Sequence, residues 1–513
     1  MDTLENYRYI LLADQPWQAN LMCTLAKELL CKDPRAQISL VFTDYYTFLL
    51  RKDYLEGLRI AFPGRVITIE KHYRNWQSKT TPVQVDENYF IDWEKKYCTD
   101  RSLKQIEKTN QWIYGNERNV YQRKIGTDWA KRILADTIDW VETLFYPNDQ
   151  PTVVVSIERS TLPTNLLYEI AKTRKIPFLT FFPSRINSRW LMRDDFGYGM
   201  SNKLKEYIQE NYSSSDSKNA ALELIEQELT RKVGSYVSIG HTISDKIQNG
   251  KINSIRIFLH ELRLWMGRVY GRIFIQPRER SIPAIRLVEN FVSLSYVEIR
   301  RIFQIQMRSL GFKLWGSSRV PEQKYFFWAL HMRPEGSVLV LGDGKDEITE
   351  LFKTVNLVPD GYFLAVKENP EMFGLRAPSF YRKLKRHPKI LLIDAFVSTY
   401  SLIQNSMGVI GISGTVLLES TYFNKPSCAL GKPEFSGFLP ENGWSAADTF
   451  FKNVLNRRYS EPLETILPYI AYVLSNSSAS DITFEGDLSL PGADSMIKRF
   501  ANDIQSYLLN LKK

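Results

Sequence analysis

The sequence has few of the residues that form cross-links and metal sites. Its 513 residues include only 4 cysteines and 5 histidines. Cys23, Cys31, Cys98 and Cys428 form no Cys-x-x-Cys pair, which argues against a disulfide scaffold or a cysteine zinc site and favours a reducing cytosol. The histidines lie far apart and form no His-Glu-x-x-His pattern. No Asp-x-Asp triplet occurs, so the usual carboxylate clamp for a metal-bound diphosphate is missing.

Long hydrophobic runs are also absent. No stretch approaches the run of about 20 apolar residues that spans a bilayer. The N-terminus has acidic residues before a short apolar run, and it lacks the basic start and long apolar segment of a secretory signal. We therefore expect a cytoplasmic protein, either free or peripheral at the inner face of the plasma membrane.

The composition is that of a globular protein with a basic surplus. Hydrophobic residues make up 44% and charged residues 24% of the chain, which excludes a disordered or collagen-like protein. The formal net charge is +10, but no motif supports a nucleic-acid partner. Residues 251–320 hold 13 Lys and Arg against 4 Glu, a net charge of +9. This stretch is either a helical linker with its arginines in solvent or a surface that docks on anionic lipid.

Short apolar runs alternate with helical patterns in both halves of the chain. Near-continuous apolar strands separated by helices are typical of parallel sheets covered on both faces. Residues 85–150 and 493–511 are expected to be helical. The sequence therefore predicts an α/β protein with two doubly wound sheets. The expected strands lie at 9–13, 38–42, 66–69, 152–157 and 176–181 in the first half, and at 337–341, 362–366, 390–393, 407–412 and 427–430 in the second.

Polar residues at the ends of these strands are the candidate site residues, because ligands of open α/β sheets bind at the carboxyl ends of strands. Ser413-Gly414-Thr415 lies between an expected strand and a helix, where hydroxyls and free amides can hold a phosphate. Glu419 follows Thr415 by one helical turn, so its carboxylate can accept hydrogen bonds from a ribose on the same side. The alternative is a plain helix N-cap with a glutamate that favours the helix dipole.

Four further charged residues are candidates on the same grounds. Lys367 ends an expected strand and suits a diphosphate or a sugar carboxylate, and Arg376 follows nine residues later. Asp14 and Glu158 end strands of the first half, and either can serve as a general base or a carboxylate nucleophile. For each of the four, the alternative is a solvated charge or a helix cap.

An ordered set of short motifs between Phe327 and Phe438 carries a family resemblance. The set resembles the capsule polysaccharide biosynthesis family of bacterial glycosyltransferases, which includes the Kdo transferases of capsule export systems. Before residue 320 only the general layout is similar. The motifs are Ala329-Leu330-His331-Met332-Arg333-Pro334-Glu335-Gly336-Ser337, Val366-Lys367-Glu368-Asn369-Pro370, Gly374-x-Arg376, Phe380-Tyr381, Ser401-Leu402-Ile403, Ile412-Ser413-Gly414-Thr415-x-x-x-Glu419, Lys425-Pro426 and Gly431.

The resemblance implies a GT-B architecture, in which two Rossmann-like domains face a cleft. Residues 1–190 would form the acceptor-side domain, 191–325 a helical basic insertion, and 326–513 the nucleotide-sugar-binding domain with a closing helix that crosses back. The resemblance also implies a donor site lined by Lys367, Asn369, Arg376, Ser413, Gly414, Thr415 and Glu419.

One position departs from the family pattern. Many members have a histidine where this chain has Asn369, and in the Kdo-transferring relatives that histidine is associated with the donor phosphate. Asparagine can donate a hydrogen bond but cannot carry charge. The departure argues against CMP-Kdo as the donor and leaves another nucleotide-sugar open.

The expected function is that of a metal-independent glycosyltransferase without a cofactor. It would move a sugar from a nucleotide-sugar to a capsule-type polysaccharide or its lipid-linked precursor, so its partners would be the donor and a glycan or glycolipid acceptor. An anionic membrane is a further candidate partner through residues 251–320. The alternatives are a polyol-phosphate transferase, a sugar-nucleotide epimerase, or a non-catalytic capsule assembly protein that keeps the fold; the Asn369 departure favours the last.

Overall fold

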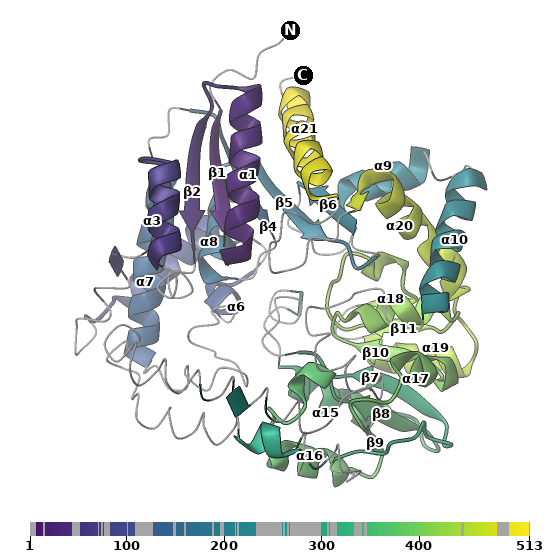
Figure 1. Cartoon of the computed structure of the whole chain (residues 1–513). Coiled ribbons are helices and arrows are strands. Elements are labelled where there is room, and N and C mark those ends of the chain that lie inside the picture. The colour runs from purple at the N-terminus through teal and green to yellow at the C-terminus, as the bar shows by residue number, and fades with distance from the viewer. Residues whose placement is uncertain are drawn as a thin grey trace.

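The structure is a computed structural model with two α/β sheets (Figure 1). The last described helix, α21 (Ala493–Leu511), runs beside the first, α1 (Pro16–Lys32). The structure describes residues 7–13, 16–43, 52–69, 71–72, 75, 83–99, 101–107, 127–146, 150–157, 161–186, 189–194, 200–210, 212, 215–231, 259, 262–263, 266, 299–304, 307, 315–332, 341–342, 346–442, 446–479 and 492–511.

The first sheet has seven strands in the order β13-β6-β5-β4-β1-β2-β3. Its central strands are parallel and buried, as the apolar runs predicted. β6 and β13 run antiparallel at one edge and were not predicted. β13 pairs with β6. The strands are β1 (Arg8–Ala13), β2 (Gln37–Phe42), β3 (Val66–Thr68), β4 (Thr152–Ile157), β5 (Phe178–Pro183), β6 (Arg189–Arg193) and β13 (Ser478–Ala479).

Helices cover this sheet and close its core. Local sequence sets some of their ends: Asp86 caps α5 by accepting a hydrogen bond from the Asn88 amide, and Pro163 lies in the first turn of α8. Seven apolar side chains of α21 join the same buried cluster, so this helix packs on the first sheet's unit. The other covering helices are α3 (Lys52–Ala61), α5 (Glu87–Tyr97), α6 (Leu103–Glu107), α7 (Thr127–Thr143) and α8 (Leu162–Thr173).

The second sheet has six parallel strands in the order β12-β11-β10-β7-β8-β9. Four of the five expected strands are confirmed. The expected strand at 337–341 is not: residues 337–340 lie outside the described part, and Leu341 is in a turn. Tyr325–Ala329 forms the strand between β10 and β8 instead. The strands are β7 (Tyr325–Ala329), β8 (Phe363–Lys367), β9 (Ile390–Ile393), β10 (Val409–Gly411), β11 (Ser427–Ala429) and β12 (Glu441–Asn442).

The helices around the second sheet build two further clusters of buried side chains, one on each face. The start of the expected linker, 191–325, is part of this unit, because α9 and α10 pack on α20. Most of the basic stretch 251–320 lies outside the described residues. The helices are α9 (Asn202–Glu210), α10 (Ser215–Arg231), α15 (Glu347–Leu357), α16 (Pro378–Lys385), α17 (Thr399–Asn405), α18 (Thr415–Tyr422), α19 (Ala446–Leu455) and α20 (Pro462–Asn476), with short 3₁₀ turns η3 (Pro370–Met372) and η4 (Ser436–Phe438).

The two units touch where the hairpin of β5 and β6 meets the second sheet's helices. Ile186 and Leu191 from the hairpin are buried in the same cluster as residues of α18 and α20. Arg185 also donates a hydrogen bond from Nη1 to the carbonyl oxygen of Ser413, at 2.7 Å. The edge of the first sheet is therefore anchored beside the turn that leads from β10 into α18. No helix in the described ranges is long and apolar enough to cross a bilayer.

Candidate functional site

The candidate site begins at the turn between β10 and α18. Gly414 is the N-cap of α18, and it has no side chain that could cap the first amide groups of the helix. A Cβ atom at Gly414 would lie 3.2 Å from Nε2 of His331, which is tighter than ordinary packing, so glycine fits this position best. Amide groups at the start of a helix, together with the positive end of its dipole, favour an anion.

Lys367 is the last residue of β8, and its side chain is buried. Its Nζ donates a hydrogen bond to Oγ1 of Thr399 at 2.8 Å. Burial lowers the pKa of Lys367 from 10.5 to about 8, while the charges of Glu419, Asp394 and Glu368 act in the opposite direction. The ammonium group is therefore mainly charged at pH 7 and lies within the field of three carboxylates.

Glu419 lies on α18, one turn after its start, and is only 4% exposed. Its charge acts on Lys367, and it also raises the pKa of Tyr400, which burial raises first. Glu419 is therefore close to both residues. The arrangement brings a buried cation and a buried carboxylate to the same end of the second sheet, beside the open amides of α18.

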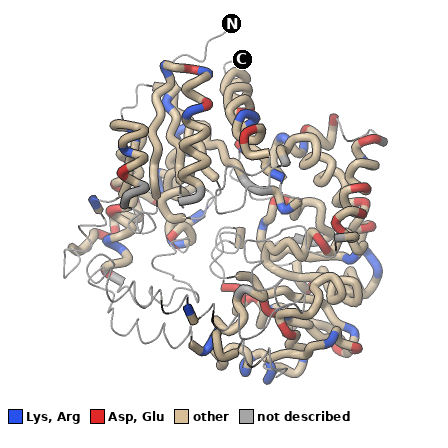
Figure 2. Tube along the Cα trace, in the orientation of Figure 1, with Lys and Arg blue, Asp and Glu red and all other residues tan. Residues whose placement is uncertain are grey.

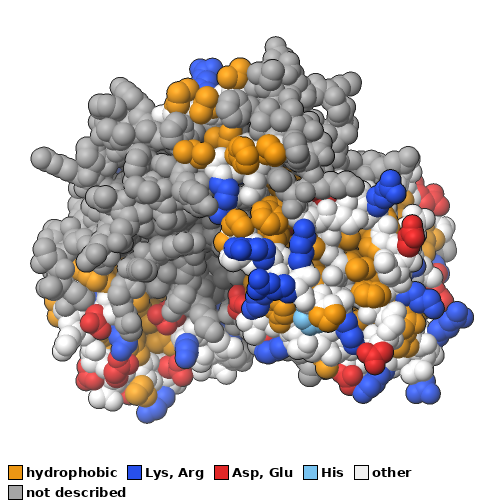
Figure 3. All heavy atoms as spheres, turned by 90° about the horizontal axis from the view of Figure 1, so that it is seen from below, with side chains coloured by type: hydrophobic (Ala, Val, Ile, Leu, Met, Phe, Trp, Pro, Cys, Tyr) orange, Lys and Arg blue, Asp and Glu red, His pale blue; other side chains and the backbone are white. Residues whose placement is uncertain are grey.

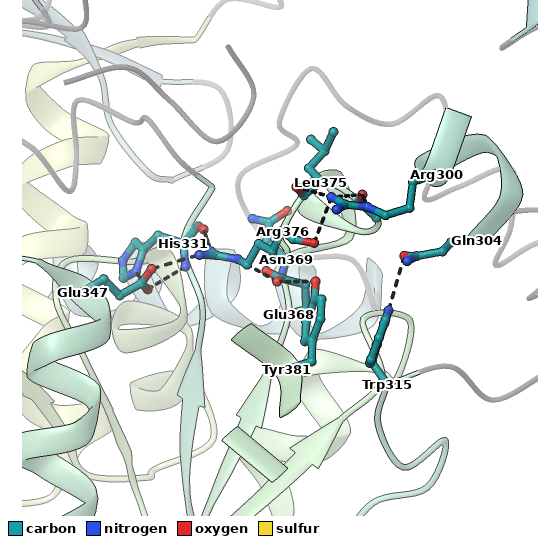
Figure 4. A network of polar contacts seen from close by, with 11 residues as sticks. Arg300, Gln304, Trp315, His331, Glu347, Glu368, Asn369, Leu375, Arg376 and Tyr381 are labelled. Atoms are coloured by element: carbon teal, nitrogen blue, oxygen red, sulfur yellow. Dashed lines mark hydrogen bonds and ion pairs between the residues drawn. The ribbon is translucent and has the colours of Figure 1, made fainter. Parts of the chain in front are cut away.

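A buried network of charged side chains supports this end of the sheet (Figure 4). His331 follows β7, and both its amide nitrogen and its Nδ1 contact Oε1 of Glu347, at 2.8 and 2.7 Å. Arg376 donates to the carbonyl oxygen of His331 at 2.8 Å and pairs with Oε2 of Glu368 at 2.7 Å. The Tyr381 hydroxyl donates to the same Glu368 oxygen at 2.9 Å. The network ties together the segments that follow β7 and β8.

Electrostatics make this network costly to disturb. Burial raises the pKa of Glu368, and the Arg376 guanidinium and the Tyr381 hydroxyl counteract that rise. The side chain of Arg376 is fully buried between Glu368 and Glu347. A buried ion pair is stable only while both partners are present, because a lone buried charge has no compensation.

The structure brings the C-terminal candidates together. Lys367, Ser413, Gly414, Thr415 and Glu419 gather at the carboxyl ends of β8 and β10, on either side of β7. Whether they bind a donor stays a prediction.

The other two candidates of the second half, Arg376 and Asn369, contact residues of the buried network. Arg376 is 1% exposed and contacts the His331 carbonyl oxygen and Glu368, so it connects the segments that follow β7 and β8. Asn369 is half-buried, and its backbone amide donates to Oε1 of Glu368 at 2.8 Å.

Asp14 and Glu158 lie outside the described residues, so their role as catalytic carboxylates stays a prediction. The strands that precede them, β1 and β4, are direct neighbours and run parallel, with Leu11 opposite Val155.

Sequence analysis missed the pair of His331 and Glu347. Glu347 lies in the first turn of α15, and its contact with Nδ1 leaves Nε2 of His331 facing the Ser413 amide nitrogen, 3.5 Å away. The sequence excluded the histidines as metal ligands and gave His331 only a place in a family motif. A histidine that directly follows a buried strand was the available indication, but the strand itself was not recognised.

The contact of Arg185 with Ser413 was not predicted either, because it crosses 228 positions of sequence. Its guanidinium binds the Ser413 carbonyl, so the first sheet adds a cation beside the start of α18. Burial and Glu434 raise the pKa of Tyr469, and Arg185 counteracts part of that rise. The turn at Ser413 thus has Arg185 on one side and His331 on the other.

The two sheets, each covered by helices and carrying polar groups at the carboxyl ends of parallel strands, define a GT-B-like protein with two Rossmann-like units. No family model matches the chain, and no curated protein does. Similar solved structures include the KpsC β-Kdo 2,4-transferase of Thermosulfurimonas dismutans, with 10% identity over 63% of this chain and 87% of that chain and a TM-score of 0.32.

Two further similar structures are a second KpsC transferase and an epimerase. The KpsC β-Kdo 2,7-transferase of the same organism has 11% identity over 73% of this chain and 89% of that chain, with a TM-score of 0.33. The UDP-GlcNAc 2-epimerase of Methanocaldococcus jannaschii, in complex with UDP-GlcNAc and UDP, has 13% identity over 91% and 99%, with a TM-score of 0.26. Likeness at this level assigns no activity to this chain.

Proposed function

We propose that the protein is a glycosyltransferase that moves a sugar from a nucleotide-sugar to a capsule-type surface polysaccharide or its lipid-linked precursor. The proposal rests on the burial of the Lys367 ammonium group at the carboxyl end of β8, near the start of α18, which no side chain caps. Glu419, Asp394 and Glu368 favour the charged form of this group, and an ammonium group can bind a phosphate. The ordered motifs that include Lys367, Ser413 and Glu419 support the polysaccharide as acceptor class.

Lys367, Glu419 and the start of α18 each have a role in this proposal. The diphosphate of the donor would accept hydrogen bonds from the amides at the start of α18 and from Lys367. Glu419 would accept hydrogen bonds from the ribose hydroxyls. His331 and Arg185 hold the Ser413 turn from two sides, so the amides are in place before the donor arrives.

The reaction needs charge stabilisation at the leaving group. The acceptor hydroxyl would attack the anomeric carbon as the bond from that carbon to the phosphate oxygen breaks. Negative charge then builds on the departing nucleotide, where Lys367 and the α18 amides stabilise it without reorganising. Asp14 or Glu158 would take the proton of the acceptor hydroxyl. A carboxylate of the first sheet would thus complete a site whose cations come mainly from the second.

Turnover is expected to survive EDTA. The sequence has no Asp-x-Asp triplet, and the described residues contain no group of three His, Cys, Asp or Glu suited to a metal ion. In the proposed mechanism Lys367 and the helix start supply the positive charge. Assays with EDTA, with and without added Mg²⁺ or Mn²⁺, check this expectation. A loss of turnover that either metal restores would contradict it.

Glu419→Gln is expected to weaken nucleotide binding about tenfold. A hydrogen bond to a charged group contributes roughly 1.5–3 kcal/mol, and about 1.4 kcal/mol corresponds to one decade of affinity. Because the Glu419 charge also raises the pKa of Lys367, the variant should lower that pKa further, and the loss should grow as pH rises toward 8. Isothermal titration at two pH values measures both effects.

The matched control for this variant is Glu464→Gln, an exposed glutamate in the first turn of α20. It should leave nucleotide affinity unchanged, and Glu419→Gln should change the melting temperature of the free protein only slightly, because glutamine keeps the shape. Normal nucleotide binding by a Glu419→Gln protein that melts much earlier would make Glu419 a structural residue.

The proposed activity is tested by incubating the protein with UDP-, CMP-, GDP- and CDP-linked sugars without an acceptor. A glycosyltransferase is expected to bind one of these classes and to release its nucleotide slowly to water. Conversion of the sugar without release of nucleotide would instead identify an epimerase. Absence of both binding and turnover with all four classes would favour a non-catalytic assembly protein.

A further inference from the structure

A different part of the second unit carries exposed apolar side chains on a helical turn. Residues 299–304 are helical in the described positions, and Ile299 and Phe303 are 51% and 59% exposed. They are four residues apart and therefore share one side of the turn. Ile302 and Gln304 of the same turn are buried. The turn is thus packed against the protein through Ile302 and Gln304 and presents two large apolar groups to solvent.

The neighbouring helix α16 presents basic side chains. Arg382, Lys383, Lys385 and the C-cap residue Arg386 are all exposed, and α16 contains no acidic residue. Lys383 lies over the ring of Phe352 at 4.5 Å. Within the described part of the chain, the other three form no ion pair. Figure 2 shows Lys and Arg gathered on this helix at the lower edge of the molecule.

Specific contacts hold the turn and α16 together as one surface (Figure 4). The Arg300 guanidinium donates to the carbonyl oxygens of residues 374–376, just before α16, at 2.9 to 3.2 Å for Nη2. Trp315 donates to Oε1 of Gln304 at 3.3 Å and stacks on Tyr381 of α16 at 4.9 Å. The exposed apolar groups and the basic groups therefore have a fixed relation to each other.

We propose that this basic–apolar face, formed by Ile299, Phe303, Arg382, Lys385 and Arg386, docks the protein on an anionic lipid bilayer. The basic side chains complement acidic headgroups, and the isoleucine and phenylalanine side chains fit the boundary of the acyl chains. Figure 3 looks onto this lower side of the molecule and shows Lys and Arg side chains beside hydrophobic ones. A nucleic acid would pair with the basic side chains but would give the aliphatic side chain of Ile299 no partner. The proposal is independent of the proposed activity.

The experiment measures sedimentation of the full chain with vesicles of phosphatidylcholine alone or of equal parts phosphatidylcholine and phosphatidylglycerol. We expect binding to the anionic vesicles, release at high salt, and little binding to the neutral ones. Each basic residue near an anionic surface strengthens binding about fivefold, so Arg382→Gln with Lys385→Gln should weaken it about twenty-five-fold. Ile299→Ser with Phe303→Ser should weaken it as well.

The matched control removes two lysines elsewhere, Lys452→Gln with Lys498→Gln; both are exposed and ion-paired on α19 and α21. It should bind vesicles like the wild type, and circular dichroism should show all variants folded. Three results would overturn the proposal: no binding to anionic vesicles, an equal loss in the control, or full binding by the serine variant together with displacement by RNA. The last would indicate a nucleic-acid surface.

Discussion

Lys367→Met should weaken the binding of a nucleoside diphosphate about tenfold to a hundredfold at pH 7. The wild-type ammonium group is buried and charged at this pH, and each hydrogen bond from a charged group to a phosphate contributes roughly 1.5–3 kcal/mol. Methionine keeps much of the side-chain volume but removes the charge. Isothermal titration of the nucleotide that binds best gives the two affinities.

The pH dependence of binding separates a direct role of Lys367 from a structural one. Its pKa of about 8 means that the group is charged below pH 8 and loses its proton as pH rises through that value. Wild-type affinity should therefore fall as pH rises through about 8, whereas Lys367→Met should bind weakly at every pH and show no such fall. The control is Lys389→Met, a lysine paired with Asp360 far from α18. A wild-type affinity that does not change across pH 8 would contradict the role of Lys367.

Arg376→Met should cause the largest loss of stability. Its guanidinium is the cation between Glu368 and Glu347, and all three side chains are buried. Removing one partner of a buried pair costs about 3–5 kcal/mol. For a domain of this size each kcal/mol lowers the melting temperature by about 2–4 °C, so we expect a fall of roughly 10 °C, measured by calorimetry.

A double-mutant cycle tests whether the loss comes from the uncompensated carboxylate. Glu368→Gln with Arg376→Met should be more stable than Arg376→Met alone, because the buried charge that lost its partner is then removed. Arg382→Met on the exposed side of α16 is the control and should leave the melting temperature nearly unchanged. If Arg376→Met melts like the control, the network does not hold the loops after β7 and β8.

The sheets were largely predictable because most strands are short aliphatic runs bounded by polar residues. β7 was not, since Tyr325–Ala329 is mostly aromatic and not aliphatic, and the aliphatic run near Val338 took its place in the prediction. β13 depends on its pairing with β6, a segment almost 300 residues away, as between Trp190 and Ser478. Local patterns carry no information about such contacts.

The candidate site was predictable where residues follow recognised strands. Lys367 and Ser413 were found because each lies at a strand's carboxyl end, and Glu419 because one helical turn separates it from Thr415. His331 was missed together with β7, which positions it. Arg185 reaches Ser413 only after the two units have assembled, and no spacing in the sequence indicates that contact.

Hydrogen–deuterium exchange with and without the best-binding nucleotide tests most directly whether the donor binds at the second sheet. The expected result is added protection of the amides at the start of α18, residues 413–417, and around Lys367, with little change in the first sheet when no acceptor is present. Protection confined to the first sheet, or none in the presence of a nucleotide that raises the melting temperature, would contradict a donor site at the carboxyl ends of β8 and β10.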